Sequence, residues 1–85
     1  MRAAVFHPAA RAEFEAAVAR YEAERAGLGA LFSSHVQKSV QRTVNAPLTR
    51  FPYSVVYLIE SERIFILAVA HFRRRPNFWT ERVKA

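Results

Sequence analysis

The sequence predicts a small α+β domain in which two N-terminal helices pack on one face of a small antiparallel sheet. The stretches 53–59 and 64–72, YSVVYLI and IFILAVAHF, are rich in β-branched and aromatic residues and are separated by polar residues, which is typical of a β-hairpin. Before them, residues 8–26 and about 28–44 carry apolar residues at helical spacing. A short apolar stretch, 2–6, is a candidate first strand, so the predicted order is β-α-α-β-β in one domain, 1–85.

Composition indicates a folded, basic protein. Hydrophobic residues make up 52% of the 85 residues, which is too apolar for a disordered chain. The net charge is +6, from 13 Lys and Arg against 7 Asp and Glu, and such a surplus favours an acidic partner such as nucleic acid, a ribosome or an acidic protein segment. The chain has no cysteine and no apolar run near the ~20 residues that cross a bilayer, so we expect a cytoplasmic protein without a membrane contact.

The first predicted helix begins at Pro8, which suits the first helical turn because its missing N–H costs nothing there. Its apolar stripe is Ala10, Phe14, Ala17, Val18 and Tyr21. The opposite face carries the pairs Arg11–Glu15 and Arg20–Glu24, which we interpret as a solvated surface. His7 is interpreted as a helix-entry residue.

Two glycines, Gly27 and Gly29, predict a reversal of the chain before the second helix. This helix runs from residue 28 or 30 to 44 and ends before Pro47. His35 lies on its apolar stripe without ligand-type neighbours at helical spacing, so we interpret it as a core or boundary residue.

The two hairpin stretches are nearly continuous in apolar character, which predicts that both faces of the sheet are covered. The second stretch runs into Arg73, Arg74 and Arg75, and Pro76 ends it. A helical turn over residues 76–83 is expected to follow.

Five motifs in order resemble the RelE/ParE superfamily of toxins from bacterial type II toxin–antitoxin (plasmid-stabilisation) modules. They are H-P at the first helix, Y-E near its end, G-L-G before the second helix, R-F-P-Y-S-V-V-Y on a strand, and A-V-A-H-F-R-R-R-P-N-F-W at the end. The resemblance implies a growth-inhibiting toxin that a cognate antitoxin neutralises. RelE-like members cleave messenger RNA on the ribosome, and ParE-like members poison DNA gyrase.

The sequence departs from the pattern of this family in two places. The segment between the second helix and R-F-P-Y is shorter than usual by roughly the length of a strand of about 5–6 residues and its loops. We therefore expect three strands and an exposed sheet edge that recruits a second copy or an antitoxin strand. Phe72 and Arg75 stand where glycine and aspartate are common in the family.

Cleavage of RNA without a metal needs a base, an acid and cations. The catalytic candidates are His71, Tyr53 and Tyr57, and the candidates for binding a target or its phosphates are Arg50, Arg73, Arg74 and Arg75. His71 is the natural neutral-pH base beside the arginines. The shortened segment and the position of both lysines elsewhere favour a ParE-like binding toxin over a ribonuclease, with an inactive homologue as a further alternative.

The sequence contains no pattern for a cofactor or a metal. Its three histidines are spread along the chain, it has no aspartate, and both glycines lie at the helix turn rather than in a phosphate-binding loop. We therefore expect neither a cofactor nor a metal site.

Overall fold

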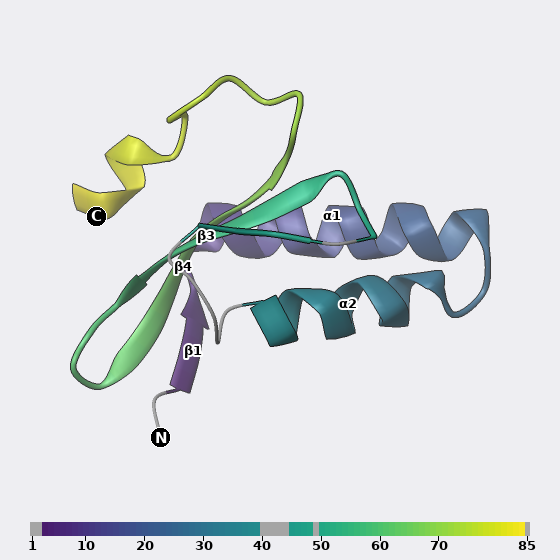
Figure 1. Ribbon diagram of the computed structural model, residues 1–85, viewed down its shortest axis with the longest axis horizontal. Helices are drawn as coiled ribbons and strands as arrows, with labels where there is room; N and C mark the ends of the chain where they lie inside the picture. Colours follow the sequence, from purple (N-terminus) through teal and green to yellow (C-terminus); the bar gives the residue numbers. More distant parts are fainter. Residues whose placement is uncertain (1–2, 40–44, 49, 85) are drawn as a thin grey trace.

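A computed structural model describes residues 3–39, 45–48 and 50–84. The elements follow in the order β1 (Ala3–Phe6), α1 (Pro8–Glu24), α2 (Leu28–Ser39), β2 (Asn45–Pro47), β3 (Tyr53–Ile59), β4 (Arg63–His71) and the 3₁₀ helix η1 (Thr80–Lys84). Figure 1 shows α1 and α2 side by side, with the β3–β4 hairpin across α1 and the C-terminal segment on the far side of the sheet. No helix in these described ranges is both long and apolar enough to span a membrane.

Helix α1 begins where the sequence predicts. Pro8 occupies the first turn, and the Ala9 amide donates to Nδ1 of His7 at 3.1 Å, so His7 is the N-cap and the prediction of a helix-entry residue is confirmed. On the predicted stripe, Ala10, Ala17 and Tyr21 are buried.

The turn between the helices depends on one glutamate. Gly27 adopts φ 89°, in the left-handed region that favours glycine. The carboxylate of Glu22, at the end of α1, accepts hydrogen bonds from the amides of Gly27 and Gly29 at 3.0 Å, which satisfies donors at the start of α2. A Cβ at Gly29 would lie 2.8 Å from the carbonyl oxygen of Val18, so glycine there lets the helices approach closely.

Helix α2 places Phe32 and Val36 in the core. The ring of His35 lies 5.5 Å from that of Phe51, and His35 is half-buried, as expected of a boundary residue. The predicted end of this helix at residue 44 lies outside the described residues, which stop at Ser39 and resume at Asn45.

The sheet differs from the predicted three-stranded antiparallel sheet in two respects. Its strand order is β1-β4-β3-β2, and β1 runs parallel to β4, so the sheet is mixed. The directions of the strands explain the parallel pair. Strand β3 is antiparallel to both β2 and β4, so β2 and β4 run the same way. Because α1 and α2 form a helical hairpin between β1 and β2, the chain enters β2 in the direction of β1, and β4 is therefore parallel to β1. The α+β class and the two helices on one face are as predicted.

The fourth strand, β2, was not predicted. It has three residues and pairs antiparallel with Ser54–Val56 of β3. The segment before the hairpin is short, but it still supplies this strand, so the expectation that no strand lies there is wrong. This strand covers one edge of β3 at these three positions.

A β-bulge lies in β4. Val56 pairs with Ala68 and Tyr57 pairs with Ile66, so Leu67 is an extra residue on β4. Ile66 and Val69 pack in the cluster that faces the helices, whereas Leu67 and Ala68 pack in a second cluster on the outer face. If the side chains of β4 alternated regularly from Ile66 without the bulge, the side chain of His71 would point away from the helices.

Both faces of the hairpin are covered, as predicted. The helices cover the inner face, where Val55, Tyr57 and Val69 are buried. Phe78 and Trp79 from the C-terminal segment pack on the outer cluster. A helical turn was predicted over 76–83, and η1 confirms one at Thr80–Lys84.

Candidate functional site: a cationic pocket between helix α1 and the end of the hairpin

A pocket of about 270 Å³ lies between α1 and the end of the hairpin at which β4 terminates. It is called the α1 pocket below. Two predicted catalytic residues, Tyr53 and His71, and one predicted binding residue, Arg74, line it. The other lining residues are Glu13, Ala16, Ala17 and Arg20 of α1 and Val69 of β4. The bulge in β4 brings His71 to this side of the sheet, beside Tyr53 at the start of β3.

Arg20 and Tyr53 form the polar contact at one side of the α1 pocket. The Nη2 atom of Arg20 donates to the Tyr53 hydroxyl at 2.7 Å, and the guanidinium lies 5.3 Å from the centre of the Tyr21 ring. Burial raises the pKa of Tyr53 above its ordinary value of 10.0, and the positive charge of Arg20 opposes this rise. Tyr53 is therefore a neutral phenol at neutral pH.

His71 packs its ring against Tyr53 at a centroid distance of 5.1 Å. Its Nδ1 atom accepts a hydrogen bond from the Arg73 amide at 3.1 Å. A neutral imidazole that accepts at Nδ1 carries its proton on Nε2. In this arrangement the basic nitrogen of His71 is already engaged, and its Nε2 atom is an N–H donor.

Glu13 joins α1 to the end of the chain. Its carboxylate forms a two-point ion pair with Arg82, at 3.0 Å from Nη1 to Oε1 and 2.8 Å from Nη2 to Oε2. Oε1 also accepts from the Val69 amide at 3.1 Å, while Nη1 of Arg82 donates to the Leu67 carbonyl at 2.9 Å. The register between β1 and β4 ends at Ile66, so these two side chains bind backbone groups of β4 beyond that pairing.

Arg74 connects the α1 pocket to the C-terminal segment. Its Nη1 lies 3.4 Å from Oε2 of Glu13, and its guanidinium stacks 3.8 Å from the centre of the Phe78 ring. Arg82 lies over the same ring at 5.0 Å. Part of the predicted cationic cluster therefore has a structural role, because Arg74 helps to fix the C-terminal segment.

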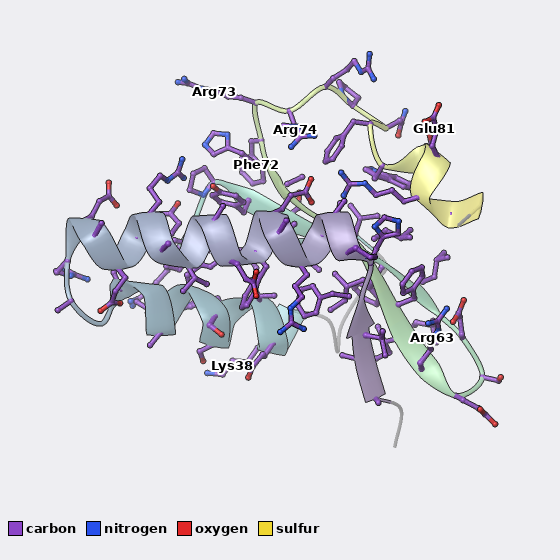
Figure 2. All side chains as sticks on the ribbon, turned by 180° about the vertical axis from the view of Figure 1, so that it is seen from behind. Lys38, Arg63, Phe72, Arg73, Arg74 and Glu81 are labelled. Carbon is purple, nitrogen blue, oxygen red and sulfur yellow. The ribbon has the colours of Figure 1, made fainter. Side chains whose placement is uncertain are left out.

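The other predicted binding residues lie outside the α1 pocket. Arg73 is exposed and extends away from the body of the domain (Figure 2). Arg75 is exposed and lines a second pocket of about 250 Å³ on the outer face, which Phe72, Phe78 and Trp79 also line. Arg50 is exposed in the bend before Phe51 and is not among the residues of the α1 pocket.

The structure separates the two tyrosines proposed as catalytic residues. Tyr53 lines the α1 pocket, whereas Tyr57 is 1% exposed and lies in the core between the sheet and the helices. The alternation predicted for β3 correctly put both on one face of the strand. It could not show that the helices cover that face at Tyr57 and leave a pocket at Tyr53.

Three residues of this region are not predicted from the sequence as site residues: Arg20, Glu13 and Arg82. Arg20 was assigned to a solvated pair with Glu24, but its side chain bonds to Tyr53 across 33 positions of the chain. Neither Glu13 nor Arg82 is among the residues that the sequence indicates as a site. No local pattern distinguishes these residues, because their partners come from other elements.

Within the described ranges, no three His, Cys, Asp or Glu side chains lie together as a metal site. No family model, no curated protein and no solved structure shows a significant match to this chain. The fold and the α1 pocket define an α+β domain with a donor-rich, cationic site. The resemblance to the RelE/ParE superfamily stays an expectation that rests on its five motifs.

Proposed function

We propose that this domain is the toxin of a bacterial type II toxin–antitoxin module and acts by binding, in the manner of ParE-like toxins on DNA gyrase. A cognate antitoxin neutralises it in the cytoplasm. The family assignment rests on the five motifs of the sequence. The choice of binding over catalysis is supported by the chemistry of the α1 pocket.

The single observation that carries this choice is the hydrogen bond from the Arg73 amide to Nδ1 of His71. Cleavage of RNA without a metal needs a group that accepts the proton of the 2′-hydroxyl. His71 has its basic nitrogen engaged, and Tyr53 holds its proton because burial raises the pKa of the phenol. The Glu13 carboxylate is bound by Arg82.

Ribosome-dependent cleavage of messenger RNA is the second candidate function. The observation that favours it is the convergence of His71, Tyr53 and Arg74 on one pocket. If substrate binding breaks the hydrogen bond to Arg73, the Nδ1 atom of His71 becomes available as a base. The two candidate functions therefore differ in whether His71 is essential.

Induced expression of the wild type and of variants tests the proposal, with growth arrest, gyrase supercoiling and cleavage of ribosome-bound messenger RNA measured in parallel. His71→Ala should lower growth arrest and gyrase inhibition only slightly, because a binding toxin needs no proton transfer by His71. The double variant Arg73→Ala, Arg75→Ala should weaken target binding by roughly tenfold, a loss that shrinks as salt rises. These two exposed arginines are chosen because Arg74 also binds Glu13.

The double variant Arg11→Ala, Arg25→Ala is the matched control, because it removes two positive charges from exposed positions on and beside α1. It should bind the target like the wild type. Messenger cleavage that disappears in His71→Ala would establish the second candidate. A folded wild type that neither arrests growth nor inhibits gyrase would contradict the proposal and identify an inactive homologue.

A further inference from the structure

The polar groups of the α1 pocket that are not already bound to Glu13 are hydrogen-bond donors. Arg20 has N–H groups beyond the one that it gives to Tyr53. The Tyr53 oxygen accepts from Arg20, which leaves its own hydrogen to donate, and burial raises the pKa of Tyr53 so that this hydrogen is retained. His71 accepts through Nδ1 and so donates through Nε2. A ligand that satisfies this set must supply acceptors.

Glu13 lines the same pocket, but its carboxylate is not the acceptor for these donors. Both of its oxygens are engaged by Arg82, and one of them also accepts from the Val69 amide. The side chains of Glu13 and Arg82 are each only 15% exposed, so their ion pair holds the carboxylate of Glu13 in place beside the pocket. The donors of Arg20 and Tyr53 are thus left for a ligand, and His71 lines the pocket beside them.

We infer that the α1 pocket binds the carboxylate of an aspartate or glutamate side chain from a protein partner, held chiefly by the Arg20 guanidinium and the Tyr53 hydroxyl. A planar guanidinium binds a carboxylate through two parallel hydrogen bonds. Ala16, Ala17 and Val69 form an apolar floor that suits the methylene groups of such a side chain. The inference rests on the proposed function in taking the partner to be a protein.

The pairing of the cations near the α1 pocket suits a single carboxylate. Arg74 and Arg82 both pair with Glu13, so the guanidinium of Arg20 is the cation left for a ligand. One planar guanidinium matches the single charge and the two oxygens of a carboxylate. Arg73 and Arg75, the exposed cations that would follow a nucleic-acid backbone, lie outside this pocket.

Nuclear magnetic resonance titration of the isolated domain tests the inference. The probe is N-acetyl-glutamate amide, which carries one side-chain carboxylate, with N-acetyl-glutamine amide as its neutral analogue and inorganic phosphate as the competing anion. We expect the glutamate probe to shift the Arg20 Nε–H and the signals of His71 and Tyr53, with a dissociation constant on the order of millimolar for so small a ligand. The glutamine probe should leave these signals unchanged.

Arg20→Gln should lower the affinity for the glutamate probe by roughly ten- to a hundredfold, which is the usual effect of losing a hydrogen bond to a charged group. Arg20→Lys keeps the charge and loses the two-point geometry, so it should bind with an intermediate affinity. The matched control is Arg11→Gln, an exposed arginine on the same helix whose side chain pairs with Glu15. This control should bind the probe like the wild type.

Equal shifts from the glutamine probe, or tighter binding of phosphate at these signals, would overturn the inference. So would undiminished binding by Arg20→Gln, provided that its spectrum shows a folded domain. If Arg20→Gln does not fold, Arg20→Lys and Tyr53→Phe take its place, and wild-type affinity in both would overturn the inference. The titration is independent of toxin action: probe binding by a domain that never arrests growth refutes the proposed function alone.

Discussion

Glu13 on α1 and Arg82 in η1 are 69 positions apart in the chain and form an ion pair through two hydrogen bonds of 2.8 and 3.0 Å. Each side chain is 15% exposed, and each also bonds to the backbone of β4. This pair therefore connects the first helix, the central strand β4 and the C-terminal segment. Glu13 also lines the α1 pocket.

The first prediction concerns the contribution of this pair to stability. Glu13→Gln removes the charge that faces Arg82 and Arg74 while it keeps the shape of the side chain. Leaving a largely buried arginine without its partner should lower the free energy of unfolding by about 3 kcal/mol. Urea denaturation followed by circular dichroism measures this change.

Glu15→Gln is the matched control, because Glu15 lies on the same helix and its side chain is 62% exposed and pairs with Arg11. Its effect should stay below about 1 kcal/mol. The fluorescence of Trp79, the only tryptophan, reports the position of the C-terminal segment and should change in Glu13→Gln alone. An equal loss of unfolding free energy in both variants would show that the Glu13–Arg82 pair contributes no more to stability than an exposed ion pair does.

The local patterns of the sequence predicted the helices and the hairpin well. Residues 53–59 form the predicted strand, and the strand predicted at 64–72 lies at Arg63–His71. The start of α1 at Pro8 and the turn at Gly27 also follow from local chemistry, namely a proline in the first turn and a glycine at positive φ. Such features depend on a few neighbouring residues, so a single sequence reveals them.

The parts of the site that were missed depend on contacts between distant elements. The bulge at Leu67 decides that His71 faces α1, yet nothing in the run ILAVAH marks an extra residue. In the sequence, Arg20 is one of several charged residues of a helix. Only the folding of the sheet places Tyr53 beside it. The short β2 lacks the length and alternation by which a strand is recognised.

The second prediction concerns Gly29, where α1 and α2 approach closely. Replacing a glycine within a helix by alanine normally stabilises it by up to about 1 kcal/mol. At Gly29 the added Cβ would lie 2.8 Å from the Val18 carbonyl oxygen and 3.0 Å from Oε1 of Glu22. Gly29→Ala should therefore destabilise the domain by about 1–3 kcal/mol, because the two helices must move apart.

The test is that Gly29→Ala should destabilise the domain, whereas the same change in an ordinary helix stabilises it. Thermal and urea unfolding measure the change in the free energy of unfolding. Gln37→Ala, at an exposed position of α2, is the control for a change of helix propensity alone and should be nearly neutral. A stabilised Gly29→Ala variant would mean that the helices are not in close contact at this point.

The third prediction uses the ionisation of Tyr53. Burial raises the pKa of its phenol above the ordinary value of 10.0, so the folded domain holds this proton more tightly than the unfolded chain does. The resulting contribution to stability is fully present below pH 10.0 and is lost as the pH rises from there through the pKa of the folded state. The free energy of unfolding should therefore fall at alkaline pH, and Tyr53→Phe should make this fall less steep.

Replacing Arg20 tests how its contact with Tyr53 affects the same ionisation. Its charge and its hydrogen bond both lower the pKa of Tyr53, against the larger effect of burial. In Arg20→Gln the pKa of Tyr53 should therefore rise further, whereas Arg11→Gln should leave it unchanged because Arg11 pairs with Glu15 away from the pocket. Ultraviolet titration of tyrosinate, with the Tyr53→Phe curve subtracted, measures the shift. A lower pKa in Arg20→Gln would show that the Arg20–Tyr53 contact does not stabilise the phenolate, and the arrangement of donors inferred for the α1 pocket would then be wrong.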